Sequence, residues 1–430
     1  DLIYKINEQF LKEIKTRFAG DPDRMTRMSL VQEGDAKRVR MAYLSIIGSR
    51  SVNGVSQLHT DLLKENLFKD FYELSPEKFN NKTNGITQRR WLLKSNPELS
   101  KLITESIGDK WVTHLEKLDG LQKYIDDAAF CDRWKKIKKQ NKDSLTRYLA
   151  KTLHVGINPD SIFDIQVKRI HEYKRQLMFA FYVISQYLKI KNDPKQFRYP
   201  RTYMIGGKAA PGYAMAKLII KFINNVAQII ENDDDVKDKM KLVFLENYRV
   251  SLAEKIFPAS DVSEQISTAG MEASGTGNMK FMLNGALTIG TLDGANIEIH
   301  DQVGAENIFI FGLKAHEVLN LRNNKYDPKE FIKKSPVLKE ILDLIKKNFF
   351  SKSESGIFEP ILSNLTSNDY FMICADFDSY HETQGVLTDE FLNKETWTKK
   401  SIINVARSGL FSSDRTIREY AKDIWHVPTE

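Results

Sequence analysis

Four short apolar runs, separated by stretches of helical periodicity, constrain the fold of this chain more than any other feature. The runs are residues 162–167 (IFDIQV), 202–205 (TYMI), 242–245 (LVFL) and 308–311 (IFIF). Between them, apolar residues recur at the helical period, as in residues 212–230. Alternation of strand and helix is typical of a parallel sheet with helices on both faces. We therefore predict an α/β fold.

Cationic or glycine-rich loops follow three of these runs. They are residues 168–175 (KRIHEYKR), 206–212 (GGKAAPG) and 246–249 (ENYR). In parallel sheets the ligand crevice lies beyond the carboxyl ends of the strands. Arginine suits bidentate phosphate recognition, and lysine supplies a point charge. We therefore expect these loops to converge on one edge of the sheet and to form an anion site.

A run of small residues at 269–278 surrounds Gly270, Gly275 and Gly277 and precedes Lys280. Such glycine density lets backbone N–H groups approach an anion closely. The run is not a Walker A loop, and Lys280 stands where a dinucleotide fingerprint has its third glycine. The alternative is a tight glycine turn followed by a solvated lysine.

The sequence after the glycine run predicts further β structure. Residues 286–290 and 296–299 are each short and apolar enough for a strand. Between them stands Asp293-Gly294, a pair typical of tight turns. We expect two short strands that support the glycine loop.

Lys280 is the candidate reactive group. A lysine that is partly desolvated and crowded by other cations has a depressed pKa, and a neutral amine can form a Schiff base with a carbonyl. Pyridoxal phosphate would supply both an aldehyde for Lys280 and a phosphate for the glycine loop. A P-loop-like nucleotide binder or a dehydrogenase uses similar parts, so these alternatives stay open on the residues alone.

Composition sets wider limits. The chain of 430 residues allows about two to three domains. Its 64 Lys and Arg exceed its 57 Asp and Glu, a net charge of +7 that favours anionic ligands. The densest basic run, residues 133–139, has apolar residues at helical spacing and is interpreted as the wet face of a helix, not a nucleic-acid site. Residues 1–75 and 92–155 are likewise predicted to be amphipathic helices.

The number of cysteines and the hydropathy of the chain indicate the cellular compartment of the protein. The two cysteines, Cys131 and Cys374, exclude a disulfide framework and a cysteine-rich zinc site. No run of about 18 apolar residues occurs. We expect a soluble cytoplasmic protein with no metal, membrane or nucleic-acid partner. Because the sequence starts at Asp1 inside a helical pattern, we expect this start to be a cut in a longer chain.

Five segments together resemble the α-glucan phosphorylases, most closely those of animal type that act on glycogen. They are residues 81–87 (NKTNGIT), 167–176 (VKRIHEYKRQ), 204–213 (MIGGKAAPGY), 246–254 (ENYRVSLAE) and 272–298. The resemblance covers residues 1–430 and implies a two-domain glycosyltransferase architecture of the GT-B type. Residues 1–84 would end an amino-terminal glucan-binding domain. Residues 85–430 would form a Rossmann-like domain that binds pyridoxal phosphate, so the chain would be the carboxyl-terminal half.

The resemblance also implies site residues. Lys280 would hold pyridoxal phosphate as a Schiff base, and it would act in catalysis together with Arg169 and Lys174, which hold orthophosphate. The other cofactor-binding residues would be Lys168, Thr276, Gly277 and Arg249 at the phosphate, with Tyr248 and Trp91 beside the ring. The glucose hydroxyls would be bound by Asn84, Tyr173, Glu272, Ala273, Ser274 and Gly275. His171 would order its loop.

The implied reaction is phosphorolysis of an α-1,4-glucan by orthophosphate, which releases α-glucose 1-phosphate with retained configuration. The cofactor phosphate would exchange a proton with the substrate phosphate, in an allosteric, homodimeric full-length enzyme. The alternatives are a fragment or binding protein without turnover and a nucleotide-sugar glycosyltransferase. Gln88 departs from the family, which usually has proline there, and we expect a looser turn at this position.

Overall fold

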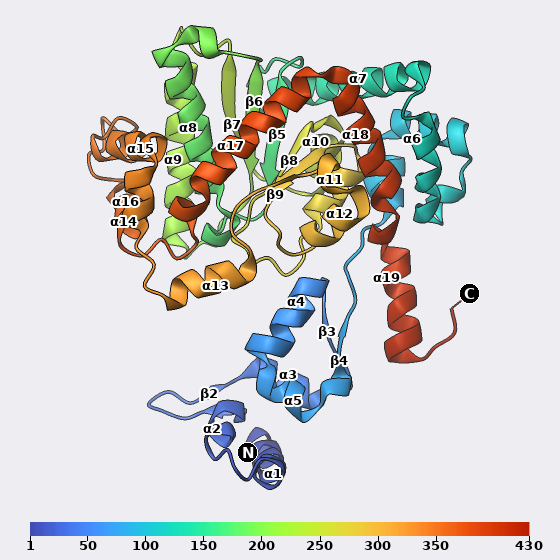
Figure 1. Cartoon of the computed structure of the whole chain (residues 1–430), viewed down its shortest axis with the longest axis vertical. Helices are drawn as coiled ribbons and strands as arrows, with labels where there is room; N and C mark the ends of the chain where they lie inside the picture. The colour runs from blue at the N-terminus through green and yellow to red at the C-terminus, as the bar shows by residue number, and fades with distance from the viewer. Residues whose placement is uncertain (430) are drawn as a thin grey trace. The chain divides into compact units, whose positions relative to one another are not determined.

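The computed structural model describes residues 1–429, which form two compact units (Figure 1). Residues 1–83 and the chain from Ile417 onward form the first unit. Residues 84–416 form the second unit. Each unit has a hydrophobic core of its own.

The first unit is mainly helical, as predicted for residues 1–75. Its helices are α1 (Leu2–Arg17), α2 (Asp23–Met28), α3 (Met41–Gly48), α4 (Gln57–Leu62) and α5 (Lys69–Leu74). Its strands are β1 (Val31–Gln32) and β2 (Arg38–Val39), which pair antiparallel, and β3 (Val52–Gly54) and β4 (Phe79–Asn81), which pair parallel. Phe10, Ile14, Met28 and Phe71 fill the core of this unit.

The second unit begins with helices that pack on one another before the chain enters the sheet. These are η3 (Arg89–Lys94), α6 (Pro97–Ile107) and α7 (Ala128–Leu153), with the 3₁₀ segment η5 (Leu115–Tyr124) between the last two. The helical prediction for residues 92–155 is confirmed. Ahead of η3, Gln88 is fully buried, and its Nε2 donates to the Val112 carbonyl at 2.8 Å. This side chain therefore connects the turn to a neighbouring segment, and the looser turn at Gln88 stays a prediction.

A six-stranded, wholly parallel sheet forms the centre of the second unit (Figure 1). The strands are β5 (Ile162–Val167), β6 (Arg201–Gly206), β7 (Met240–Leu245), β8 (Val262–Gln265), β9 (Leu287–Gly290) and β10 (Phe309–Ile310). Their spatial order is β10-β9-β8-β5-β6-β7. The predicted α/β class and all four apolar strands are confirmed.

The chain reverses direction across the sheet after β7. It adds β6 and β7 on one side of β5, then returns to place β8 on the other side. In open α/β sheets, such a reversal opens a crevice at the carboxyl ends of the two strands that flank it. The ends of β5 and β8 are therefore the expected position of a ligand site.

Helices cover both faces of the sheet. One core contains side chains of α8 (Gln176–Asn192), α9 (Ala214–Glu231), α15 (Pro336–Lys346), α16 (Glu359–Ser367) and α17 (Ile373–Leu392). The opposite core contains side chains of α6, α7, α10 (Val250–Ala259), α11 (Gly277–Leu283), α12 (Asn296–Val303) and α18 (Lys394–Ala406). The remaining helices are α13 (Ala315–Asn323), α14 (Pro328–Lys334) and α19 (Ser413–Tyr420).

The predicted strand at residues 296–299 is wrong, because this segment is the start of α12. Strands β9 and β10 pair parallel, so the chain between them must cross from one end of the sheet to the other. A hairpin at Asp293-Gly294 cannot make that crossing, whereas α12 does. The strand predicted at 286–290 is confirmed as β9.

A buried polar network fixes α17 against the sheet. Arg201 of β6 pairs with Asp164 of β5 at 2.6 Å and donates to Gln384 of α17 at 2.5 Å. Gln384 and Tyr380 of α17 both donate to the Glu264 carboxyl group of β8. Burial, together with the nearby charge of Asp164, raises the pKa of Glu264 well above its usual value. Burial raises the pKa of Asp164 as well, and the charge of Arg201 opposes that rise. The ion pair with Arg201 therefore favours the charged form of Asp164.

Substitutions at these two acids should have unequal effects on stability. Asp164→Asn should lower the free energy of unfolding by about 3–5 kcal/mol, because it leaves a buried guanidinium without its counter-ion. Glu264→Gln keeps the shape of the side chain and removes no counter-ion of Arg201, so it should cost less than about 1 kcal/mol. Urea unfolding at pH 7 measures both values. Equal losses would contradict the assignment of Asp164 as the counter-ion of Arg201.

Candidate active site

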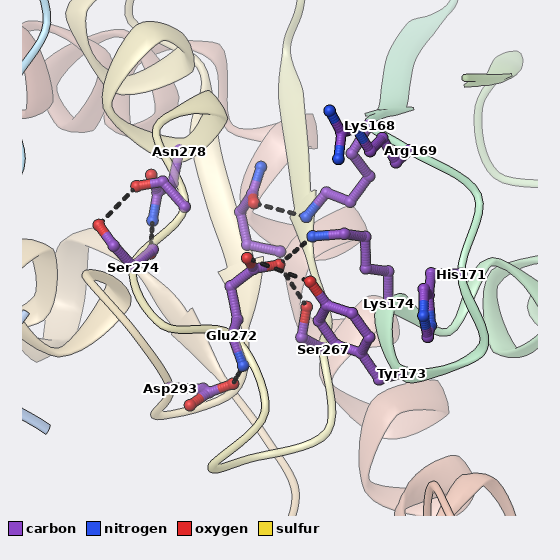
Figure 2. A network of polar contacts seen from close by, with 12 residues as sticks. Lys168, Arg169, His171, Tyr173, Lys174, Ser267, Glu272, Ser274, Asn278 and Asp293 are labelled. Atoms are coloured by element: carbon purple, nitrogen blue, oxygen red, sulfur yellow. Dashed lines mark hydrogen bonds and ion pairs between the residues drawn. The ribbon is translucent and has the colours of Figure 1, made fainter. Parts of the chain in front are cut away.

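The candidate site lies at the carboxyl ends of β5 and β8, where the strand order reverses (Figure 2). The loop after β5 contributes Lys168, Arg169, Tyr173 and Lys174. The segment after β8 contributes residues 266–276, which include most of the glycine run at 269–278. A backbone hydrogen bond from Thr268 N to the Tyr173 carbonyl, 2.9 Å long, joins the two segments. The sequence placed both beside a shared anion site, and the structure brings them together.

Lys168 connects the end of β5 with the glycine run. Its Nζ donates to Gln265 Oε1 of β8 at 2.8 Å, and Gln265 Nε2 lies 4.0 Å from the position of a Cβ on Gly277. Burial lowers the pKa of Lys168 to about 8. Lys168 therefore supplies a poorly solvated cation next to the start of α11.

Lys174 and Glu272 form the central ion pair of the cluster (Figure 2). Both side chains are largely buried, at 13% and 19% exposed. Burial alone would lower the pKa of Lys174, but the Glu272 carboxylate outweighs burial and the net pKa is raised. Burial opposes ionisation of Glu272, yet the charges of Lys168 and Lys174 lower its pKa. Both groups are therefore charged at neutral pH.

Asp293 holds the backbone of the glycine run in place. Its two carboxyl oxygens accept the N–H groups of Gly270 and Glu272, each at 2.8 Å. The carboxyl group is almost wholly buried, which raises its pKa to about 7. At Gly294 a Cβ would lie 2.5 Å from the Ser274 carbonyl oxygen, at a φ of +49°, so this position needs glycine. Sequence reasoning treated Asp293-Gly294 only as a turn and missed this anchoring role.

Lys280 lies one turn into α11. Its Nζ stands 4.4 Å from the centre of the Trp91 ring and 3.4 Å from Thr276 Oγ1. The pKa of Lys280 is lowered, as the sequence analysis expected. The expected cause was partly wrong, since burial lowers it and no neighbouring cation contributes. Trp91 itself is 8% exposed and is fixed by a hydrogen bond from Asn284 to its carbonyl at 2.7 Å.

The start of α11 offers backbone donors. The first N–H groups of a helix have no acceptor within it, and no acceptor among residues 1–429 serves those of Thr276, Gly277 and Asn278. Asn278 is buried, and its side chain donates to Asn296 Oδ1 of α12 at 3.0 Å. This hydrogen bond connects the end of the glycine run to α12. These amides, together with Lys168, form a cationic cradle suited to a phosphate group.

The other candidate residues of the two loops differ in their burial and in their contacts. Ala273, Ser274 and Gly275 belong to the loop itself, with Ser274 buried and Gly275 at a φ of +75°. Arg169 is exposed, and its guanidinium has no ion pair or hydrogen bond within residues 1–429. His171 packs against the rings of Tyr173 and Tyr213, consistent with an ordering role.

Three candidates make no hydrogen bond or ion pair with the cluster in the described part of the chain. Asn84 accepts a long hydrogen bond from Arg415 through its carbonyl. Arg249 is exposed and donates to the Asn247 carbonyl at 3.2 Å. Tyr248 is partly buried against the core that contains α7 and α10, and burial raises its pKa.

Arg175, grouped by sequence with the cationic loops, is not part of the anion site. Its guanidinium is fully buried and pairs with Asp376 of α17 at 2.6 Å. It also donates to the backbone carbonyls of Ile266 and Ser267. Arg175 therefore fixes the backbone of the segment after β8 through these hydrogen bonds.

The donor set suits a phosphorylated aldehyde better than a metal. Among residues 1–429, no group of three or more His, Cys, Asp or Glu is placed to hold a metal ion. Lys280 has a lowered pKa and an aromatic neighbour, and the backbone amides before it lie near Lys168, a partly buried lysine. An aldehyde and a phosphate on one small molecule would fit this arrangement.

Among residues 1–429, no helix combines the length and the hydropathy that a membrane-spanning helix needs.

Comparison with known proteins identifies the family. A family model described as carbohydrate phosphorylase matches residues 1–427. Because this match covers nearly the whole chain, the chain belongs to the carbohydrate phosphorylase family, and the resemblance drawn from the sequence motifs is confirmed.

Individual relatives are glycogen phosphorylases. The chain is 51% identical to the glycogen phosphorylase of Synechocystis sp. and to the muscle form of Mus musculus, and 52% identical to the brain form of Homo sapiens. Each alignment covers 99% of this chain and 50% or 51% of the relative. The chain therefore spans about half the length of the relatives it matches.

Replacing Asp293 tests its anchoring role. Asp293→Asn leaves one acceptor oxygen for two N–H groups, so it should cost about 1–3 kcal/mol of stability. Hydrogen exchange at Gly270 and Glu272 should accelerate, while the exposed control Asp238→Asn should change neither quantity. Unchanged exchange at both amides would contradict the anchoring role.

The cost of Asp293→Asn should also depend on pH. The pKa of Asp293 is about 7 in the folded protein, against about 3.9 in an unfolded chain. Its contribution to stability is complete below pH ~4 and is lost as the pH rises towards 7. Because the variant does not titrate here, the stability difference between wild type and variant should be largest near pH 4 to 5 and smaller at pH 8. Unfolding free energies across this range measure it.

Proposed function

We propose that this chain carries the cofactor and phosphate site of a glucan phosphorylase. The reaction is the cleavage of an α-1,4-glucan such as glycogen by orthophosphate, with release of α-glucose 1-phosphate. The observation that carries the proposal is Lys280, a half-buried lysine with a lowered pKa that stands against Trp91 and directly follows an amide cradle. The glycogen phosphorylases among the relatives support the same reading.

Pyridoxal phosphate is the cofactor that this arrangement would hold. Lys280 would bind its aldehyde carbon, and Trp91 and Tyr248 would line its ring. Thr276, Gly277 and Lys168 would bind its phosphate, with Arg249 near by. When bound, the cofactor supplies a phosphate with a second pKa of about 6, which suits proton exchange near neutral pH.

Arg169 and Lys174 would hold the substrate orthophosphate. Lys174 is already neutralised by Glu272, whereas Arg169 makes no ion pair in the described chain and can give its full charge to a new anion. A guanidinium binds a phosphate through two parallel hydrogen bonds. Arg169 is therefore the principal phosphate ligand, and it offsets the repulsion between two phosphates brought close together.

Glu272 and its neighbours would bind the glucose unit. The Glu272 carboxylate stays charged and fixed by Lys174, so it can accept a sugar hydroxyl. Ser274, Ala273 and Gly275 extend this surface, and Tyr173 contributes its hydroxyl group. Asn84 would join them from the start of the second unit.

The chemistry follows from where Arg169 holds the orthophosphate. The bound orthophosphate gives a proton to the glycosidic oxygen, and the bond from that oxygen to the anomeric carbon breaks. A phosphate oxygen then bonds to the anomeric carbon on the face that the leaving glucan vacated. Glucose leaves as α-glucose 1-phosphate with retained configuration, and the shortened glucan keeps the proton.

The whole enzyme would be larger than this chain. We propose the two-domain GT-B architecture, with residues 1–84 at the end of the glucan-binding domain and residues 85–430 as the Rossmann-like cofactor domain. Turnover, allosteric control and a cytoplasmic homodimer are proposals for the protein of full family length. The chain alone would bind cofactor without turning over substrate.

Arg169→Ala tests the proposed function in the protein that carries this chain. Phosphorolysis should fall by about 10²- to 10³-fold, the usual loss for a preorganised cation at a reacting phosphate, while cofactor content stays the same. Arg147→Ala, an exposed arginine on α7, is the matched control and should keep full activity. Release of glucose 1-phosphate measures turnover, and absorption measures the cofactor. Undiminished phosphorolysis in Arg169→Ala would contradict the role, and absence of phosphorolysis in the wild type would favour a binding protein.

A further inference from the structure

A cationic cavity lies in the second unit, away from the active-site cluster. It is lined by α7, α18, the end of α17 and the segments that enter β5 and β8. Its volume is about 220 Å³. Helices α7 and α18 are labelled in Figure 1 and pack together through buried side chains such as Trp134 and Ser401, which are joined by a 3.0 Å hydrogen bond. None of the residues assigned to the active site lines this cavity.

The wall of the cavity combines large apolar rings with ammonium groups. Phe391 and Trp397 pack edge to face, with ring centres 5.0 Å apart. Trp134 of α7 also lines the cavity, together with five lysines and two aspartates. Apolar walls with a few convergent polar groups are typical of small-molecule sites. At this size the cavity suits a ligand of about one ring with one substituent.

Three of the five lysines have carboxylate partners. Lys135 pairs with Asp132 at 2.7 Å, and Lys139 pairs with Asp160 at 2.6 Å. A third pair joins Lys142 to the buried Asp261, also at 2.6 Å. The carboxylates that line the cavity are therefore already used.

The other two lysines have no carboxylate partner among residues 1–429. Lys138 Nζ donates to three backbone carbonyls, at 2.7 to 3.0 Å. Lys394 is an exposed residue, and its Nζ makes no hydrogen bond there and lies 3.1 Å from the centre of the Phe391 ring. Burial lowers the pKa of Lys138 to about 8, partial desolvation lowers that of Lys394 to about 8, and Asp261 offsets both effects only in part. The cavity thus holds more positive charge than its own carboxylates balance, and the donors of Lys394 are open to solvent and to a ligand.

We propose that this cavity binds a small aromatic anion, with its ring among Trp134, Phe391 and Trp397 and its negative group at Lys394. The ring replaces water against apolar walls, and the anion supplies the missing negative charge. A neutral ligand of the same shape would gain only the first of these two contributions. Charge is therefore the discriminating feature of the ligand.

Benzoate and benzamide are matched probes, because they share a shape and differ in charge. Binding to the protein that carries this chain is measured by calorimetry and by quenching of tryptophan fluorescence, which Trp134 and Trp397 report. Benzoate should bind saturably, and benzamide at least about tenfold more weakly. Equal affinity for the two, or no saturable benzoate binding up to about 10 mM, would overturn the proposal.

Variants locate the binding site. Lys394→Met should weaken benzoate binding by about tenfold or more, the loss of a charge-assisted contact. Lys151→Met, an exposed lysine on α7, is the matched control and should bind as the wild type does. Arg169→Ala should also bind as the wild type does; weaker binding there would place the anion at the active site and overturn the proposal, as would unchanged binding in Lys394→Met.

Chemical protection gives an answer that needs no altered protein. Reductive methylation followed by peptide mass spectrometry reports how accessible each lysine amine is. Benzoate should slow modification of Lys394 several-fold and leave Lys151 unchanged, and benzamide should do neither. Modification of Lys394 at the same rate with and without saturating benzoate would overturn the proposal.

Discussion

The parallel pairing of β8 with β5 is the constraint on which the rest of the structure depends. It sets Val262 beside Asp164 and Ser263 beside Ile165 after the chain has built β6 and β7 on the far side. Because parallel strands end at the same edge, this pairing brings the basic loop after β5 against the glycine run after β8. The buried acids of the same strands connect the sheet to α17, Asp164 through Arg201 and Glu264 directly through Gln384.

Burial and pairing then give the lysines of the site different properties. Burial depresses the pKa of Lys168 and Lys280, whereas the Glu272 carboxylate reverses the effect of burial at Lys174. One lysine is thereby suited to covalent chemistry, one to a phosphate and one to fixing a carboxylate. Arg169, which is exposed and unpaired in the described chain, remains available for an incoming anion. The proposed phosphorylase reaction needs all of these functions within one cluster.

The sequence predicted those helices and strands that have one clear hydrophobic period. It did not predict elements and side-chain positions that depend on tertiary contacts. The four apolar strands, the helices between them and the meeting of the two loops were predictable, and the family motifs named Lys280. Strand β8 was not predicted, because Ser263, Glu264 and Gln265 are polar. In the fold they are buried, and Glu264 and Gln265 bond to Tyr380 and Lys168, which lie far along the chain. Residues 296–299 have strand-like composition, but the parallel sheet requires a helix there. The anchoring by Asp293 and the interior position of Arg175 depend on contacts that no local pattern encodes.

In the proposed function, Lys280 is the residue that holds the cofactor. Its most direct test is borohydride reduction of the protein that carries this chain after loading with pyridoxal phosphate, followed by peptide mapping. We expect a pyridoxyl group on the peptide that contains Lys280, with Lys168 unmodified, and loss of the label in Lys280→Met. A label on Lys168 or on an exposed lysine, or no label on fully loaded protein, would contradict it.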